Sequence, residues 1–170
     1  LAPSEGSVYQ TNGSFIVLGN SDLNKPGYTF SGWNLNAANT GPTYQAGDSY
    51  SLANAGVSFY AKWIATPYYV SYYAADKTSG AVPVDSASYT ISTSINIRGN
   101  SGNLQRTGYT FAGWADNAQR TGRIYLSGDT YTVQTNDLSF YAAWTARTYS
   151  ITYDLNGASG SPSKLSDSYT

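Results

Sequence analysis

Few side chains in this sequence are suited to catalysis. The chain has no His and no Cys, which excludes a catalytic triad, a thiolate nucleophile and a His/Cys zinc site. Glycoside hydrolysis needs two carboxylates at a defined separation, but the one Glu is Glu5, close to the N-terminus. Asp48 and Asp129 each follow a Gly at matched positions of two similar segments, which is typical of turn formers. We therefore expect no enzymatic activity and no cofactor.

One short stretch has a faint likeness to a metal-binding loop. Residues 154–157 read Asp-Leu-Asn-Gly, which resembles the start of a calcium loop. The remaining ligands of such a loop do not follow, so we predict a turn without a metal ion.

The aromatic residues offer a binding function, because exposed rings can stack on sugars. However, Trp33 and Trp63 recur as Trp114 and Trp144, and recurrence at matched positions favours packing in a core. Tyrosines outside the shared pattern, such as Tyr68 and Tyr72, are better candidates for contact with a ligand.

The overall charge argues against several partners. The net charge is −1 and the nine basic residues are scattered, so we expect no nucleic-acid binding. No apolar run approaches the roughly 20 residues of a membrane span, so we expect no membrane insertion in this segment. The lack of Cys is compatible with the cytosol and with bacterial surface proteins. Low charge and an abundance of Ser, Thr, Asn, Gly and Tyr favour the extracellular space or cell surface of a bacterium.

An internal repeat organises these residues. The stretch Gly27–Trp33 returns as Gly108–Trp114, and 108 minus 27 gives an offset of 81. Ser58–Trp63 returns at the same offset as Ser139–Trp144. A tandem repeat of this length predicts small consecutive units that contact mainly their neighbours.

The repeated segments read as β-strands. Aromatic and β-branched residues fit a pleated sheet, while Gly, Asn, Asp and Ser supply its turns. Alternation along 28–33 places Tyr28, Phe30 and Gly32 on one face, and Trp33 on the other. We predict a mainly β fold whose structural core contains Tyr28, Phe30, Trp33, Phe59, Trp63, Tyr109, Phe111, Trp114, Phe140 and Trp144.

The order of motifs resembles a known family. Tyr-x-(Ile/Val)-Thr-Tyr-Asp-x-Asn-Gly is followed by Val-Pro, Gly-Tyr-Thr-Phe-x-Gly-Trp, Gly-x-x-Tyr-x-x-Gly-Asp and Phe-Tyr-Ala-x-Trp. This pattern is similar to the Listeria–Bacteroides repeat, or internalin-type B-repeat, of bacterial surface proteins. The copy at 69–76 departs from it, because Ala74-Ala75 replaces the usual Asp and its neighbour.

The resemblance implies tandem β-grasp-like units with very short linkers. In such a unit, the first and last strands lie side by side in the middle of the sheet. On this basis residues 1–66 are a unit lacking its first strand, and 67–146 are a complete unit. Residues 147–170 are the first strand and following segment of a further unit.

The chain therefore begins and ends part-way through a repeat unit, and two interpretations of this are open. The chain is either a fragment cut out of register with its repeat, or a subunit that polymerises head to tail. In the second case Tyr149, Ile151 and Tyr153 form a strand-donor interface that fills an open central slot in another copy.

The sequence favours a structural role, as a stalk, spacer or fibre module. Its partners are then further copies of itself or adjacent repeats. The alternative is an adhesin module that binds a glycan or a host receptor.

Overall fold

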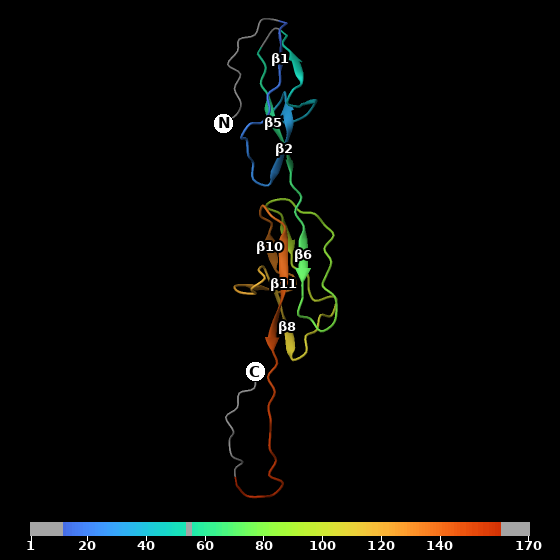
Figure 1. Ribbon diagram of the computed structural model, residues 1–170, viewed down its shortest axis with the longest axis vertical. Coiled ribbons are helices and arrows are strands. Elements are labelled where there is room, and N and C mark those ends of the chain that lie inside the picture. Colours follow the sequence, from blue (N-terminus) through green and yellow to red (C-terminus); the bar gives the residue numbers. More distant parts are fainter. Residues whose placement is uncertain (1–11, 54–55, 161–170) are drawn as a thin grey trace.

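The computed structural model describes residues 12–53 and 56–160, and this part of the chain is built from strands and turns. Two units lie end to end along an elongated molecule (Figure 1). No helix long and apolar enough to cross a membrane occurs among the described residues. The prediction of a mainly β fold is confirmed.

The second unit has a four-stranded sheet and a separate two-stranded ribbon. The sheet has the order β6-β11-β8-β9, and the ribbon pairs β7 with β10 in antiparallel fashion. Their bounds are Val70–Tyr73 for β6, Ser94–Asn96 for β7, Tyr109–Ala115 for β8, Ile124–Tyr125 for β9, Thr130–Thr132 for β10 and Leu138–Ala146 for β11.

The first unit repeats this arrangement without a counterpart of β6 among its described residues. Its sheet has the order β3-β2-β5, and its ribbon pairs β1 with β4. The bounds are Ser14–Ile16 for β1, Tyr28–Asn34 for β2, Thr43–Tyr44 for β3, Ser49–Ser51 for β4 and Tyr60–Ala65 for β5.

The first strand of the complete unit lies at the edge of its sheet. Strand β6 pairs in parallel with β11, with Val70 opposite Leu138 and Tyr73 opposite Tyr141. The first and last strands are therefore neighbours, but the expected central position is wrong for β6. The reason is that the next strand, β7, does not return to pair with β6 and instead pairs with β10. In the first unit, no described strand pairs with the outer edge of β5, so the expected central slot is an edge position.

A β-bulge at the second Gly of the repeated motif decides which face its Trp occupies. The pairing of β2 with β5 shifts register between Phe30 and Trp33, and Gly32 lies there with φ of 112°. The extra residue returns Trp33 to the side of Phe30, with ring centroids 5.3 Å apart. Strict alternation had placed these two rings on opposite faces, and that prediction is wrong.

Only Gly fits at this bulge. A Cβ on Gly32 would lie 2.7 Å from the backbone oxygen of Tyr44, and one on Gly113 would lie 2.6 Å from that of Tyr125. Contacts this short with backbone cannot be relieved by rotating a side chain. The motif therefore carries Gly here for steric as well as conformational reasons.

The core of the second unit lies between the sheet and the ribbon. Trp114 and Phe140 are fully buried, and Ile95, Ile97 and Val133 cover them from the ribbon side. Trp33 is also buried in the first unit. The other residues predicted for the core are partly buried: Tyr28, Phe30, Phe59, Trp63, Tyr109, Phe111 and Trp144.

Replacing Trp114 with Ala should destabilise the second unit by about 3–5 kcal/mol, the usual cost of losing a buried large aromatic side chain. Denaturant unfolding followed by circular dichroism measures this change. Val84→Ala is the control, because Val84 is 79% exposed. An unchanged unfolding midpoint for Trp114→Ala would contradict the packing described here.

Candidate functional site

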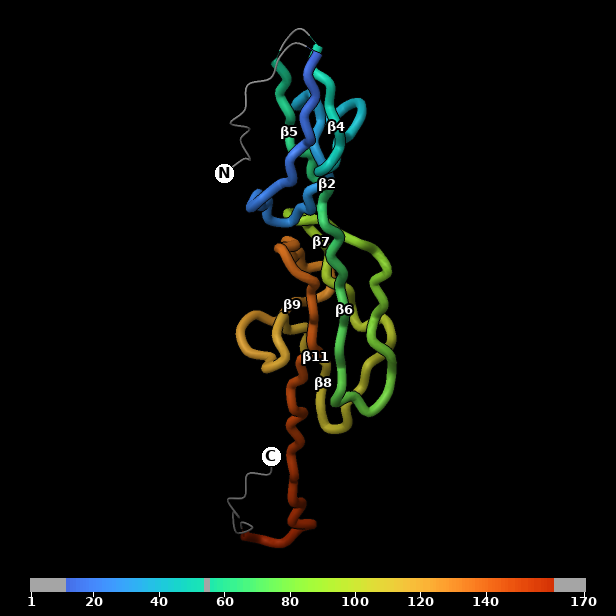
Figure 2. Tube along the Cα trace, turned by 45° about the horizontal axis from the view of Figure 1, so that its top comes forward, coloured from blue at the N-terminus to red at the C-terminus, as the bar shows by residue number. Residues whose placement is uncertain are grey.

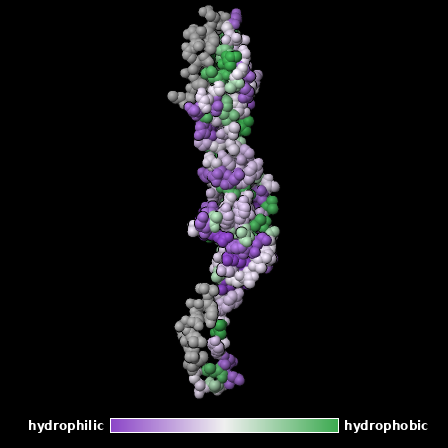
Figure 3. All heavy atoms as spheres, viewed as in Figure 1, coloured by the Kyte–Doolittle hydropathy of each residue, from purple (hydrophilic) through white to green (hydrophobic). Residues whose placement is uncertain are grey.

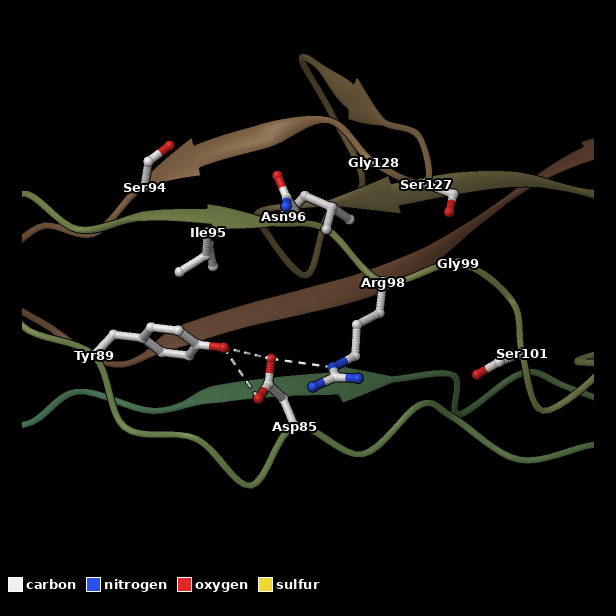
Figure 4. Close-up of a pocket in the computed structure, with 11 residues that line it drawn as sticks. Asp85, Tyr89, Ser94, Ile95, Asn96, Arg98, Gly99, Ser101, Ser127 and Gly128 are labelled. Carbon is white, nitrogen blue, oxygen red and sulfur yellow. Dashed lines mark hydrogen bonds and ion pairs between the residues drawn. The ribbon is translucent and has the colours of Figure 1, made fainter.

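A polar groove lies on the surface of the second unit. It opens beside β7, and its polar rim includes Ser94, Asn96, Ser101 and Ser127. Figure 4 shows the guanidinium of Arg98 and the ring of Tyr89 converging on the carboxylate of Asp85. This set of charged and polar side chains could contact a small ligand.

The carboxylate of Asp85 anchors the groove. Its side chain is 4% exposed, and Oδ2 lies 3.1 Å from Nε of Arg98. The hydroxyl of Tyr89 donates to Oδ2 at 3.1 Å, and the N–H of Ala87 donates to Oδ1 at 3.2 Å. Burial alone would raise the pKa of Asp85, but these hydrogen bonds, that from Arg98 foremost, hold it below its ordinary value of 3.8.

Arg98 also ties three parts of the unit together through its backbone. Its N–H donates to the hydroxyl of Tyr72 at 3.0 Å, and its carbonyl oxygen accepts from Nε1 of Trp114 at 2.9 Å. In the first unit the carbonyl that accepts from the matching Trp33 belongs to Leu18. The ion pair is therefore an addition of the second unit to a shared backbone arrangement.

Tyr68 and Tyr72 are not available in the way the sequence suggested. Tyr72 is buried at 5% exposure, stacks on Phe140 and accepts the Arg98 N–H. Tyr68 exchanges backbone hydrogen bonds with Tyr89 and packs against the core. The expectation that Tyr72 faces a ligand is wrong, because β6 turns alternate residues inward.

A second charged cluster, centred on Asp76, connects several strands and loops of the second unit. Asp76 forms ion pairs with Arg106 at 3.0 Å and Arg120 at 3.1 Å. Its other oxygen accepts from Nε1 of Trp144 at 3.2 Å. These contacts join the end of β6 to the segment before β8, to the loop after β8 and to β11. Asp76 thus fastens the edge strand to the rest of the unit.

The repeated aspartates serve turns. Oδ2 of Asp48 accepts the N–H of Gln45 at 2.6 Å, and Oδ2 of Asp129 accepts that of Leu126 at 3.0 Å. Near the C-terminus, Oδ1 of Asp154 accepts the N–H of Asn156 at 2.8 Å. Across residues 12–53 and 56–160 there is no group of three or more His, Cys, Asp or Glu that could hold a metal ion.

The proposed donor residues form an exposed apolar stripe on an extended segment. Tyr149, Ile151 and Tyr153 are 77%, 72% and 71% exposed. Figure 3 shows apolar residues in green on this C-terminal extension. At the offset of 81, Ile151 and Tyr153 correspond to Val70 and Tyr72 of β6, which are buried. The stripe therefore has the pattern of a first strand, and it pairs with no other strand among the described residues.

Comparison with known proteins agrees with this repeated architecture. The model of the Listeria-Bacteroides repeat domain matches residues 4–62 and 68–143. The chain belongs to this family. Each match covers one of the two units, so the resemblance seen in the motifs is confirmed.

Two curated relatives come from Evansella cellulosilytica. One, named "Putative Gly-rich membrane protein", is 28% identical over 161 residues, which cover 92% of this chain and 18% of the relative. The other, named "Putative membrane protein", is 31% identical over 121 residues, covering 71% and 17%. The chain thus spans less than a fifth of the length of either relative. No solved structure matches it.

The Asp85–Arg98 pair predicts acid-sensitive stability. Because the folded-state pKa of Asp85 is lowered, its contribution is present above the ordinary value of 3.8 and is lost as the pH falls through the folded value. Asp85→Asn should cost about 1–2 kcal/mol at neutral pH, given a charge-assisted bond to a half-exposed partner.

The free energy of unfolding of both proteins, measured between neutral pH and pH 2–3, tests this. The gap between them should narrow on acidification. Asp22→Asn, at an exposed position in the first unit, is the control. A gap that stays constant with pH would contradict the role assigned to the Asp85 carboxylate.

Proposed function

We propose that this segment is a load-bearing stalk or spacer module of an extracellular bacterial surface protein. The observation that carries the proposal is the parallel pairing of β6 with β11, the first and last strands of the complete unit. Membrane-protein names among the relatives and the family's occurrence in surface proteins support a location at the cell envelope.

Parallel terminal strands give a unit resistance to pulling along the chain. Tension enters at the N-terminal end of β6 and leaves at the C-terminal end of β11, which lie at opposite ends of the paired region (Figure 1). The force then acts on all hydrogen bonds of the pair together. Antiparallel strands loaded at one end would separate bond by bond.

Side chains reinforce the same pair of strands. Tyr72 stacks on Phe140 with ring centroids 5.5 Å apart on the buried face. Tyr73 stacks on Tyr141 at 5.2 Å on the other face. The N–H of Leu138 also donates to the carbonyl of Tyr69 at 2.8 Å. Sliding β6 against β11 would break these contacts at once.

The connection between the units is short and held on both sides. The N–H of Thr66 donates to Gly27 in the first unit at 2.9 Å. Two residues later, the N–H of Tyr68 donates to Tyr89 in the second unit at 2.7 Å. A linker of this length cannot act as a flexible tether, so a semi-rigid rod is expected.

Single-molecule pulling on the second unit tests the load-bearing role. The chain has no Cys, so engineered thiols provide unique attachment points. Handles at Pro67→Cys and Arg147→Cys load β6 and β11 in shear, whereas handles at Pro67→Cys and Asn136→Cys peel the strands from one end. All three positions are exposed. The rupture force should be clearly higher in shear, and equal forces in the two geometries would contradict the proposal.

Head-to-tail strand donation is a second candidate, favoured by the exposed stripe and by the edge of β5, with which no described strand pairs. In the register of β6 with β11, the offset of 81 would set Tyr153 opposite Phe59 and Ile151 opposite Val57. Phe59 is only partly buried, while its counterpart Phe140 is fully buried under Tyr72. A donated strand would supply the missing ring and pair the open edge.

Light scattering on the 170-residue chain tests this donation. We expect oligomers from the intact chain and monomers when residues 148–170 are removed. Ile151→Lys should also give monomers, because its side chain lies on the stripe. Thr152→Lys, on the opposite face of the same segment, is the matched control. A monomeric intact chain, or oligomers that Ile151→Lys leaves unchanged, would rule out donation.

The adhesin alternative rests on the groove around Arg98. The Arg98 side chain is particular to the second unit, since Leu18 occupies the equivalent position in the first. Binding of a glycan or a host receptor would therefore be a property of particular copies in a longer array, added to the structural role that all copies share.

A further inference from the structure

The two units touch through a Gly of the first and an Ile of the second. Gly27 is buried, and a Cβ built on it would lie 2.7 Å from both Cβ and Cγ2 of Ile91. Ile91 lies in the turn that precedes β7. Figure 2 shows β7 near the end of the second unit that faces the first. The side chain of Ile91 thus occupies the space that any other residue at position 27 would need.

The corresponding Gly of the second unit has no such neighbour among the described residues. Gly108 has φ of 79°, close to the 76° of Gly27, but no atom of residues 12–53 or 56–160 outside its chain neighbours lies within 4 Å of the position of a Cβ there. The surroundings are otherwise alike. Gly27 accepts the N–H of Thr66 at 2.9 Å, and Gly108 accepts that of Arg147 at 2.8 Å.

A cation and an aromatic ring flank each of these glycines. Nζ of Lys25 lies 4.0 Å from the ring centroid of Tyr28, and Cζ of Arg106 lies 3.9 Å from that of Tyr109. The surface around Gly108 therefore already has the form that, around Gly27, receives Ile91. It does not need to rearrange in order to receive a similar side chain.

We propose that the end of the second unit around Gly108 is a docking surface for the next repeat of the same polypeptide. The residue of that repeat that corresponds to Ile91 would seat on Gly108. Each joint would then be a Gly socket filled by a branched apolar side chain. This inference deepens the proposed stalk function, because it names the contact that sets the angle and stiffness between units.

The two glycines form a matched pair for testing the occupied joint. Both have positive φ, so Ala imposes similar backbone strain at each. Only Gly27→Ala also creates a clash with Ile91. Spin labels at Ser51→Cys and Thr132→Cys, exposed and equivalent positions of the two units, report the distance between them by pulsed electron resonance. We expect Gly27→Ala to lose the single narrow distance and Gly108→Ala to retain it.

Ile91→Ala and Ile91→Val give an independent measurement at the same contact. The Ala variant should broaden the distance distribution, and the Val variant should keep it narrow because it retains the branched contact. Thermal unfolding of each variant checks that both units stay folded. If Gly27→Ala, Gly108→Ala and the parent all give the same distribution of spin-label distances, the proposed contact between Gly27 and Ile91 does not hold the units together, and the proposal fails. Such a result, alongside high rupture force in shear, would leave the stalk function intact.

A three-unit chain tests the socket around Gly108. Ser168-Tyr169-Thr170 matches Ser88-Tyr89-Thr90, so a copy of residues 91–146 placed after Thr170 completes a further unit. In that chain the residue after Thr170 is a copy of Ile91. Gly108→Ala should now broaden the distribution of distances between spin labels on the second and third units. If Gly108→Ala leaves that distance as narrow as in its parent, the docking surface is not used and the proposal fails.

Discussion

The hydrogen bond from the indole of Trp114 to the carbonyl of Arg98 joins the sheet to the ribbon, and the rest of the unit is arranged around it. Its length is 2.9 Å, and Trp33 makes the same bond to Leu18 at the same length. A buried indole N–H without an acceptor would be costly. The bulge at the preceding Gly is what turns the ring inward, so one backbone irregularity decides how two layers meet.

Comparing the units isolates the contribution of β6. With β6 present, Phe140 is fully buried beneath Tyr72, and the cluster of Asp76 fastens the strand at its end. Without a counterpart among the described residues, Phe59 stays partly exposed even though its other aromatic neighbours are retained. The strand that pairs in parallel with β11 thus completes the core of the unit.

The offset of 81 and the turn aspartates were predictable from the sequence, because both depend on local residue types repeated in order. The face of Trp33 was not, since a bulge adds one residue to a strand and reverses the alternation beyond it. The edge position of β6 depends on the strand with which β7 pairs. That pairing joins distant parts of the sequence, so local residue types do not predict it. The contacts of Asp85 with Arg98 and of Gly27 with Ile91 join residues in different segments of the chain, and no spacing rule links them.

The two glycines of Gly-Tyr-Thr-Phe-x-Gly-Trp therefore do different physical work. At Gly113 a side chain would meet the backbone of Tyr125, which cannot move without breaking the pairing of β8 with β9. At Gly27 it would meet a side chain of the neighbouring unit, so the unit itself could still fold. Beyond the positive φ that both positions share, a side chain at the second Gly would disturb the sheet of its own unit, whereas one at Gly27 would disturb the contact with the neighbouring unit. One seven-residue motif thus contributes both to the fold of a repeat and to the contact between the two described units.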